Sequence, residues 1–437
     1  KRWDLVWKSP HMLFCKYPPV AQVCSAHMRA TYYGWITCVG CTTIPQIHFT
    51  VKHNPSDMKI LFIIDDFVSS NNGTTISCRR FANELRHKGH QVRILGVCHP
   101  TEKDAYPLEK YDFPIVEPLL QKYDFHFPVI DMHIVREAIA WADLVHCMMP
   151  YALTYRCIPV IRELNKPATS AFHIQPENVL SAFSMGKWSW LNHLVYRIWD
   201  KMIYSHFHHV HCPSPFMANE LLRHGYKNDI RAISNGISSA FVEQKHYKSP
   251  TYEGKIVITM VGRLAREKRQ DLVIRAAALS KYADKIQLVF AGKGPLKDNY
   301  QRLAKRIGLT NPPAFVYYNQ EQLLDLLAQT DVYVQASDME SEAIACIEAF
   351  ATGLVPVISD SRLSATKSFA LDYRSLFHAG DAKDLAHKID YWLDHPEERN
   401  AMGKRYAQEA DKYSLEHSVR AFTSMCEDML RLHSEKI

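Results

Sequence analysis

The sequence predicts an α/β protein made of two successive doubly wound domains, each with a parallel sheet that is covered by helices on both faces. The chain has 437 residues, more than a single compact hydrophobic core usually accommodates. Apolar strands and amphipathic helices alternate from Met58 onward, and the alternation starts again after residue 250. Strands that are apolar throughout and separated by helices are typical of parallel sheets with right-handed crossovers.

The first domain is predicted over residues 58–250. Its opening strand is the apolar run 59–64, which leads through a polar loop ending near Gly73 into a helix. A second strand follows at 91–96, and a later one ends at His173. Because ligands of doubly wound sheets bind beyond the carboxyl ends of the strands, we expect the loops at these ends to face a cleft.

The second domain is predicted over residues 251–415, after a stretch that contains Ser, Pro and Gly. Its first strand is the apolar run 256–261, followed directly by the turn Gly-Arg-Leu-Ala-Arg-Glu-Lys at 262–268. A further strand at 286–290 enters a glycine-containing turn. Residues 416–437 are expected to form an amphipathic helix that lacks a strand partner and packs across the junction of the two domains.

Residues 1–57 differ from the rest of the chain, because they show no clear hydrophobic period and hold four cysteines. We expect this segment to be an extension outside the fold or an artefact of start assignment. Its cysteines are Cys15, Cys24, Cys38 and Cys41, and only the last two have the spacing of zinc ligands. A zinc site is therefore not expected here.

The composition is that of an ordinary globular protein, with 47% hydrophobic and 22% charged residues. The formal net charge is +6, and the excess of basic residues lies in the first half of the chain, which suits an anionic surface or ligand. Eleven cysteines without a disulfide-like pattern favour a reducing, cytoplasmic location. No apolar run is long enough for a transmembrane helix, and no nucleic-acid partner is expected.

Two pairs of charged residues suggest a ligand. Glu340 stands in a loop before a predicted helix and Glu348 stands two turns inside that helix. At this spacing each carboxylate can accept hydrogen bonds from a different hydroxyl-rich group of one extended molecule, such as a nucleotide sugar. Arg263 and Lys268 place two cations at a strand-to-helix turn, where backbone N–H groups and the helix dipole already favour a phosphate.

Together these motifs resemble the family 4 retaining glycosyltransferases, which have the GT-B fold, and the resemblance extends over roughly residues 58–430. It implies that Arg263 and Lys268 bind the diphosphate of the donor and stabilise the leaving nucleotide. It also implies that Glu340 contacts the donor sugar, that Glu348 holds the ribose and that His173 lies beside the sugar. His173, Arg263, Lys268 and Glu340 are thus the expected catalytic residues.

Further donor contacts are implied by the family's glycine loops and by the backbone between the two glutamates. They are Gly73, Gly292, Gly294, Ala343 and Ile344. The chain departs from the family where Ser341-Glu342-Ala343 replaces Glu-Gly-Phe-Gly or a similar run after the first glutamate. Glu342 adds an acid beside the backbone that faces the phosphate, so donor choice is expected to differ here. The alternative is that Glu340 and Glu342 are simply exposed surface residues.

The resemblance implies transfer with retention and without a protein nucleophile. The acceptor hydroxyl attacks the face that the diphosphate leaves, and a phosphate oxygen takes its proton. Neither a metal nor a cofactor is expected, because Asp65-Asp66 lacks the Asp-x-Asp spacing and the cation pair takes the place of a divalent ion. Histidines at 206, 208, 209 and 211 alternate along a predicted strand, so we expect them to be structural rather than metal ligands.

The segment 183–211 carries the clue to the acceptor. Trp188, Leu191, Val195, Ile198 and Met202 recur at helical spacing, with Trp190 and the basic residues Lys187, Arg197 and Lys201 nearby. Such a helix suits a membrane interface with anionic headgroups, and a core-facing helix is the equally weighted alternative. Gln175, Glu177 and Asn178 lie just before it and are expected to contact the acceptor.

The function predicted from the sequence is therefore transfer of a hexose, glucose or galactose, from a UDP-sugar to a hydroxyl acceptor. The preferred acceptor is a membrane lipid such as diacylglycerol or a sphingolipid, at the inner face of the membrane. A glycosyltransferase of capsule, exopolysaccharide or lipopolysaccharide assembly is the first alternative. A GT-B sugar-nucleotide epimerase or hydrolase, or a nucleotide-sugar binder without catalysis, is the second.

Overall fold

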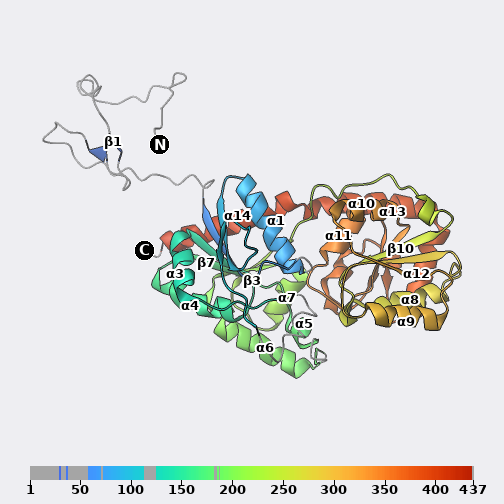
Figure 1. Ribbon diagram of the computed structural model, residues 1–437, viewed down its shortest axis with the longest axis horizontal. Helices are drawn as coiled ribbons and strands as arrows, with labels where there is room; N and C mark the ends of the chain where they lie inside the picture. Colours follow the sequence, from blue (N-terminus) through green and yellow to red (C-terminus); the bar gives the residue numbers. More distant parts are fainter. Residues whose placement is uncertain are drawn as a thin grey trace, which may run out of the picture. The chain divides into compact units, whose positions relative to one another are not determined.

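The computed structural model describes residues 58–69, 72–112, 125–181, 185–186 and 188–435, and the backbone of two short strands near the N-terminus. The chain divides into two units, Lys1–Pro55 and Ser56–Ile437. In the first unit, β1 (Arg29–Ala30) pairs antiparallel with β2 (Ile36–Thr37). The second unit contains both large sheets (Figure 1).

The first large sheet has seven parallel strands in the spatial order β5-β4-β3-β6-β7-β8-β9. Their bounds are β3 (Lys59–Asp66), β4 (Gln91–Val97), β5 (Ala105–Pro107), β6 (Leu144–Cys147), β7 (Ala168–Ala171), β8 (His209–Cys212) and β9 (Asp229–Ala232). The order reverses at β3, since the next two strands lie on one side of it and the later ones on the other. This reversal is the switch point of a doubly wound sheet.

Helices cover both faces of this sheet. They are α1 (Gly73–His87), α3 (Met132–Trp141), α4 (Ala152–Glu163), α5 (Pro176–Ser181), α6 (Ser189–Met202) and α7 (Pro215–Arg223). Side chains of β3 alternate between two hydrophobic clusters, because Phe62 and Ile64 pack with α1 whereas Leu61 and Ile63 pack with α3 and α4. Burial on both faces explains why this strand is an unbroken apolar run.

The second large sheet has six parallel strands in the order β12-β11-β10-β13-β15-β17. The strands are β10 (Ile256–Val261), β11 (Ile286–Ala291), β12 (Ala314–Val316), β13 (Val332–Gln335), β15 (Pro356–Ser359) and β17 (Leu376–Phe377). The switch point lies between β10 and β13. A small parallel pair, β14 (Met339–Glu340) with β16 (Leu363–Ser364), follows β13. Two parallel α/β sheets confirm the predicted fold class, while the boundary at residue 250 stays a prediction.

The helices of the second sheet surround one large core with a smaller satellite cluster. They are α8 (Gln270–Leu279), α9 (Lys297–Ile307), α10 (Gln320–Ala328), α11 (Ile344–Ala351), α12 (Ala382–Asp394) and α13 (Pro396–Ala410). Short 3₁₀ turns include η4 (Arg266–Lys268) and η7 (Asp411–Tyr413). We call residues 58–233 together with the C-terminal helix the first lobe, and residues 256–410 the second lobe.

The C-terminal helix α14 (Leu415–Ser434) returns to the first lobe and lies beside α1 (Figure 1). Its buried Phe422 packs against Phe62 and Phe81, with ring centroids 5.7 and 5.5 Å away. At the crossing, the Ile237 N–H donates to the Tyr413 carbonyl at 2.8 Å and the Leu415 N–H donates to the Ile237 carbonyl at 3.1 Å. The two passages of the chain between the lobes are therefore bonded to each other.

Candidate active site

The switch point of the second sheet brings a predicted cation and a predicted carboxylate together. Strands β10 and β13 are neighbours, and the loops after their carboxyl ends carry Lys268 and Glu340. Lys268 Nζ donates to Oε1 of Glu340 at 2.5 Å, although the residues lie 72 positions apart. Gln335 Nε2 donates to the same oxygen at 2.9 Å. The sheet topology thus places this pair where doubly wound folds bind ligands.

Arg263, the second predicted cation, is held by a neighbour that the sequence did not single out. Its Nη2 donates to Oε1 of Glu267 at 2.7 Å, and its carbonyl accepts from Gln270 Nε2 at 2.9 Å. Burial alone raises the pKa of Glu267, but the ion pair with Arg263 outweighs it and the pKa lies below the usual value. Arg263 and Lys268 are therefore both paired with carboxylates in this structure.

The N-terminus of α11 adds a second element that favours an anion. Ala343 precedes Ile344, the first helical residue, with φ at 69°, and no side chain caps this end of the helix. Uncapped N–H groups in the first turn, together with the helix dipole, attract phosphate. A left-handed alanine costs about 1 kcal/mol or more, so the backbone is strained where donor contacts are predicted.

Glu348 lies buried on α11 and forms an ion pair with the first lobe. Arg80 of α1 donates from Nη2 to Oε1 of Glu348 at 2.6 Å, across 268 positions of sequence. The same guanidinium donates from Nη1 to the Gly236 carbonyl at 3.3 Å. Burial raises the pKa of Glu348, and Arg80 opposes that rise. Sequence reasoning missed Arg80, because nothing local to α1 marks it.

His173 follows β7 and is buried beside the loop that carries Glu340. Its carbonyl accepts from Ser341 Oγ at 2.9 Å, and Ser214 Oγ donates to the Ser341 carbonyl at 2.6 Å. Burial, and secondarily His211 with its ring centroid 5.0 Å away, hold the pKa of His173 well below the ordinary value. The imidazole is therefore neutral near pH 7, a form that both donates and accepts hydrogen bonds.

Glu342 is buried rather than exposed. Only 3% of its surface is accessible, and its Oε2 accepts from Asn235 N at 3.0 Å and Asn235 Nδ2 at 2.6 Å. Burial raises its pKa to about 7. Glu340 is also only 8% exposed, so the alternative that both are surface residues is wrong.

The predicted glycines allow two loops of the site to approach each other. A Cβ on Gly292 would lie 2.1 Å from the Gly262 carbonyl oxygen, and one on Gly294 would lie 2.5 Å from that of Leu264. Gly73, at the start of α1, has no atom within 4 Å of such a Cβ. The ligand contacts of all three glycines stay predictions.

Two of the predicted acceptor residues, Gln175 and Glu177, are buried. Gln175 is buried and its Nε2 lies 3.5 Å from the Leu363 carbonyl of the second lobe. Glu177 accepts from Tyr196 Oη at 3.4 Å, and burial raises its pKa. Asn178 is half-buried, and Lys187 lies outside the described residues. Their contact with an acceptor stays a prediction.

Helix α6 exposes much of its apolar side. Trp188 and Trp190 are 51% and 65% exposed and stack with ring centroids 6.3 Å apart. Large exposed side chains continue along the helix with Leu194, Ile198 and Met202, whereas Leu191 and Val195 are half-buried. The fully buried residues are Asn192 and Tyr196. The alternative that this apolar stripe faces the core is therefore wrong for Trp188, Ile198 and Met202, which are exposed.

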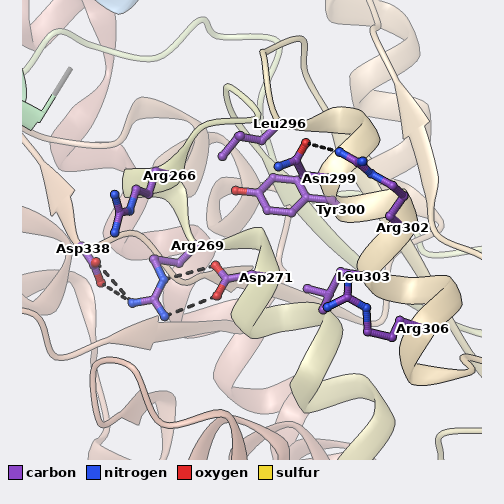
Figure 2. Close-up of a pocket in the computed structure, with 10 residues that line it drawn as sticks. All are labelled: Arg266, Arg269, Asp271, Leu296, Asn299, Tyr300, Arg302, Leu303, Arg306 and Asp338. Carbon is purple, nitrogen blue, oxygen red and sulfur yellow. Dashed lines mark hydrogen bonds and ion pairs between the residues drawn. The ribbon is translucent and has the colours of Figure 1, made fainter. Parts of the chain in front are cut away.

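A cavity of about 670 Å³ adjoins the 266–269 turn. None of the predicted site residues lines it; its walls include Arg266, Arg269, Tyr300, Arg302 and Arg306 (Figure 2). Arg269, with φ at 60°, donates to Asp271 at 3.2 Å and to Asp338 at 3.1 Å. Figure 2 shows its guanidinium between the two carboxylates, so that it ties the loop after β10 to the loop after β13.

Among the described residues, one group has the composition of a metal site. Possible ligand atoms of His208, His209 and Asp229 lie within 4.8 Å of one another. They stand at the amino ends of β8 and β9, and Asp229 already accepts from Arg231 Nε and Nη2. The group therefore belongs to the first large sheet, whereas Lys268 and Glu340 follow strands of the second. The four N-terminal cysteines considered as zinc ligands lie outside the described residues.

The seven described cysteines are all buried free thiols. None of the helices in the described ranges combines the length and hydrophobicity that crossing a bilayer requires.

Two family models match consecutive parts of the chain. Residues 71–241 match the model described as Glycosyltransferase Family 4, and residues 241–409 match Glycosyl transferases group 1. Alpha-monoglucosyldiacylglycerol synthase of Streptococcus pneumoniae is 25% identical over 325 residues, 69% of this chain and 71% of that protein. Sulfoquinovosyl transferase SQD2 of Arabidopsis thaliana is 23% identical over 77% of this chain and 66% of its own length.

A structural comparison gives the same fold. The crystal structure of Anabaena Alr3699/HepE in complex with UDP-glucose matches 85% of this chain and 100% of its own, with a TM-score of 0.63 and 15% identity. At this identity the likeness concerns the fold.

Proposed function

The chain belongs to the family 4, group 1 glycosyltransferases with the GT-B fold, and we propose that it transfers a hexose from a UDP-sugar to a membrane lipid with retention of configuration. The observation that carries this proposal is the charged cluster at the β10–β13 switch point. Two cations and an uncapped helix N-terminus converge there with the carboxylate of Glu340. These groups match a diphosphate next to a sugar hydroxyl.

The proposed chemistry begins when the two cations exchange their ion-pair partners. When the donor binds, its diphosphate takes the place of Glu267 at Arg263 and of Glu340 at Lys268. The released Glu340 carboxylate then accepts from sugar hydroxyls, and neutral His173 hydrogen-bonds the sugar from the first lobe. As the bond to the anomeric carbon breaks, negative charge grows on the diphosphate, where the cations and the α11 N-terminus stabilise it. The acceptor hydroxyl attacks from the same face, and its proton passes to a phosphate oxygen.

A lipid acceptor is supported by the relatives and by α6. One relative, at 25% identity, is named as the synthase of a glucosylated diacylglycerol, which is a lipid. Another, at 23% identity, is named as a sulfoquinovosyl transferase. Helix α6 contacts α5 through Tyr196 and Glu177, and α5 begins three residues after His173. Exposed apolar side chains with Arg197 and Lys201 at their side fit the interface of an anionic bilayer. The seven buried thiols suit the cytoplasmic face.

The test of function uses UDP-glucose and UDP-galactose, each with and without a membrane lipid extract. We expect UDP release that depends on lipid, and a glycolipid whose mass increases by one hexose. Lys268→Ala should reduce the rate at least a hundredfold, because removing one group that stabilises the transition-state charge costs about 3 kcal/mol. Lys305→Ala, an exposed lysine on α9, is the matched control and should keep the wild-type rate.

The alternatives give different outcomes. Turnover of the donor without lipid would indicate a hydrolase or epimerase, and transfer to a soluble glycan would indicate polysaccharide assembly. Donor binding without turnover over a broad panel of acceptors would leave a nucleotide-sugar binder. Full activity of Lys268→Ala would contradict the assignment of this cluster.

A further inference from the structure

The ion pair between Arg80 and Glu348 connects the two lobes inside the proposed donor site. Arg80 comes from α1, which begins at Gly73, and Glu348 comes from α11. The guanidinium is anchored at two points, Glu348 Oε1 at 2.6 Å and the Gly236 carbonyl at 3.3 Å. Because Gly236 belongs to the crossing between the lobes, Arg80 is fixed at the position where the lobes meet.

The geometry leaves part of the carboxylate for a ligand. Arg80 occupies Oε1 of Glu348 through one hydrogen bond. A carboxylate has about four acceptor positions, so Oε2 and a second lone pair of Oε1 remain for hydroxyl groups. The guanidinium contact restricts rotation of the carboxylate, and it therefore limits the directions in which the remaining lone pairs point.

Arg80 also affects the protonation state of Glu348. Two charged or titratable groups interact with Glu348, namely Arg80 on α1 and Tyr333 on β13. Tyr333 also interacts with Glu340, and Arg80 also interacts with Glu342. Burial drives Glu348 toward its protonated form, Arg80 opposes this, and Lys268 is already bound to Glu340. A protonated carboxyl group offers fewer acceptor positions to a diol.

We propose that Arg80 is a positioning residue of the donor site, which holds the Glu348 carboxylate charged and oriented so that it accepts from vicinal ribose hydroxyls. This rests on the proposed function for the identity of the ligand. It also makes donor binding depend on contact between the lobes, because Arg80 and Glu348 belong to different ones. The ligand class at this subsite is the ribose diol of a nucleoside diphosphate.

The first test measures binding of UDP alone by calorimetry between pH 6 and pH 8.5. Arg80→Ala should weaken binding about tenfold at pH 7, the loss of one hydrogen bond to a charged group. The defect should grow as the pH falls and shrink toward pH 8.5, because Glu348 without its cation binds a proton more readily. Arg80→Lys keeps the charge and should give an intermediate affinity.

Two controls separate positioning from general damage. Arg136→Ala removes an exposed arginine whose ion pair with Glu163 is also 2.6 Å long, and UDP binding should not change. In a Glu348→Gln background, adding Arg80→Ala should cause no further loss, because the two residues act as one unit. The proposal is overturned if Arg80→Ala binds UDP as well as or better than the wild type at pH 6. In that case Arg80 either competes with UDP for Glu348 or only contributes to packing.

A second measurement does not need a ligand. The carboxyl ¹³C signal of Glu348, assigned with Glu348→Gln, should titrate at higher pH in Arg80→Ala than in the wild type. An unchanged titration overturns the role of Arg80 even if UDP binds. The opposite result is also informative. If Glu348 titrates at higher pH in Arg80→Ala but the wild-type protein binds neither UDP nor UDP-sugars, the effect of Arg80 on Glu348 is supported. The proposed function and the ribose subsite are then refuted.

Discussion

At the residue scale, the segment that contains Glu340, Glu342 and Glu348 gives three buried carboxylates three different environments. Glu340 is paired with Lys268 and Glu348 with Arg80, and both partners are full charges. Glu342 instead accepts from the amide and backbone of Asn235. A carboxylate stabilised by neutral donors is more easily protonated than one stabilised by a cation, and burial raises the pKa of Glu342 to about 7.

This difference predicts a pH dependence of stability. The pKa of Glu342 rises from 4.5 to about 7 on folding, so the folded protein binds more protons than the unfolded chain between these values. The free energy of unfolding therefore falls as the pH rises through this interval, by about 3 kcal/mol in total. Glu342→Gln keeps an acceptor for Asn235 and removes the titration, so its stability relative to wild type should increase from pH 5 to pH 7.5.

Denaturant unfolding at several pH values measures the effect. Glu397→Gln, an exposed glutamate on α13, is the control and should show no such trend. A constant difference between Glu342→Gln and wild type over the whole range would show that Glu342 does not titrate there.

At the scale of elements, the loops after β10 and β11 form one rigid unit. The Gly262 N–H donates to the Ala291 carbonyl and the Leu264 N–H to the Lys293 carbonyl, both at 2.9 Å. Glycine is required at 292 and 294 because a side chain there would overlap backbone atoms of the neighbouring loop. The position of Arg263 and Lys268 is thus set partly by a loop that carries neither residue.

Gly294→Ala should move the cation loop. Its Cβ would overlap the Leu264 backbone, at a cost of about 1–3 kcal/mol, and UDP affinity should fall at least tenfold. Gly308→Ala is the control, since φ is 79° there and no atom lies within 4 Å of the added Cβ. It should lose about 1 kcal/mol of stability and bind UDP normally. Calorimetry with UDP, combined with denaturant unfolding, separates the two cases, and equal UDP affinities would contradict the prediction.

The sequence was sufficient to predict the two doubly wound sheets and to assign Lys268 and Glu340 to loops of one cleft, but not to predict which side chains meet. The Lys268–Glu340 ion pair depends on β10 and β13 being neighbours, and the alternation of strands and helices does not give this strand order. Arg80 and Asn235 meet their partners 268 and 107 positions away. Those contacts depend on how the two lobes and the segment between them pack against each other. The spacing of apolar residues along the sequence does not carry this information. Likewise, helical spacing marked the apolar side of α6 but not whether other elements cover it.

At the scale of the whole molecule, exposed aromatic side chains define how the protein can approach a surface. Trp188 and Trp190 lie at the start of α6, in the first lobe. Their indole rings combine large apolar area with a polar N–H, which suits the headgroup region of a bilayer.

Replacing both tryptophans by serine should reduce binding to vesicles of phosphatidylglycerol and phosphatidylcholine at least tenfold, equivalent to about 1.4 kcal/mol of lost burial. Flotation of the protein with the vesicles provides the measurement, and high salt should weaken binding further by screening Arg197 and Lys201. Tyr373→Ser removes an aromatic ring that is 75% exposed in the second lobe and should bind like the wild type. Unchanged flotation of the double variant would remove α6 from the proposed membrane face.

The paired passages at Ile237 and Ser414 have a topological consequence. A protease that cuts once between residues 241 and 256 produces two fragments, and the C-terminal fragment still carries α14. That helix fills the core of the other fragment with Phe422 between Phe62 and Phe81. After one break in the backbone, the two fragments should therefore stay associated rather than separate as free lobes. Each fragment keeps side chains that belong to the hydrophobic core of the other lobe.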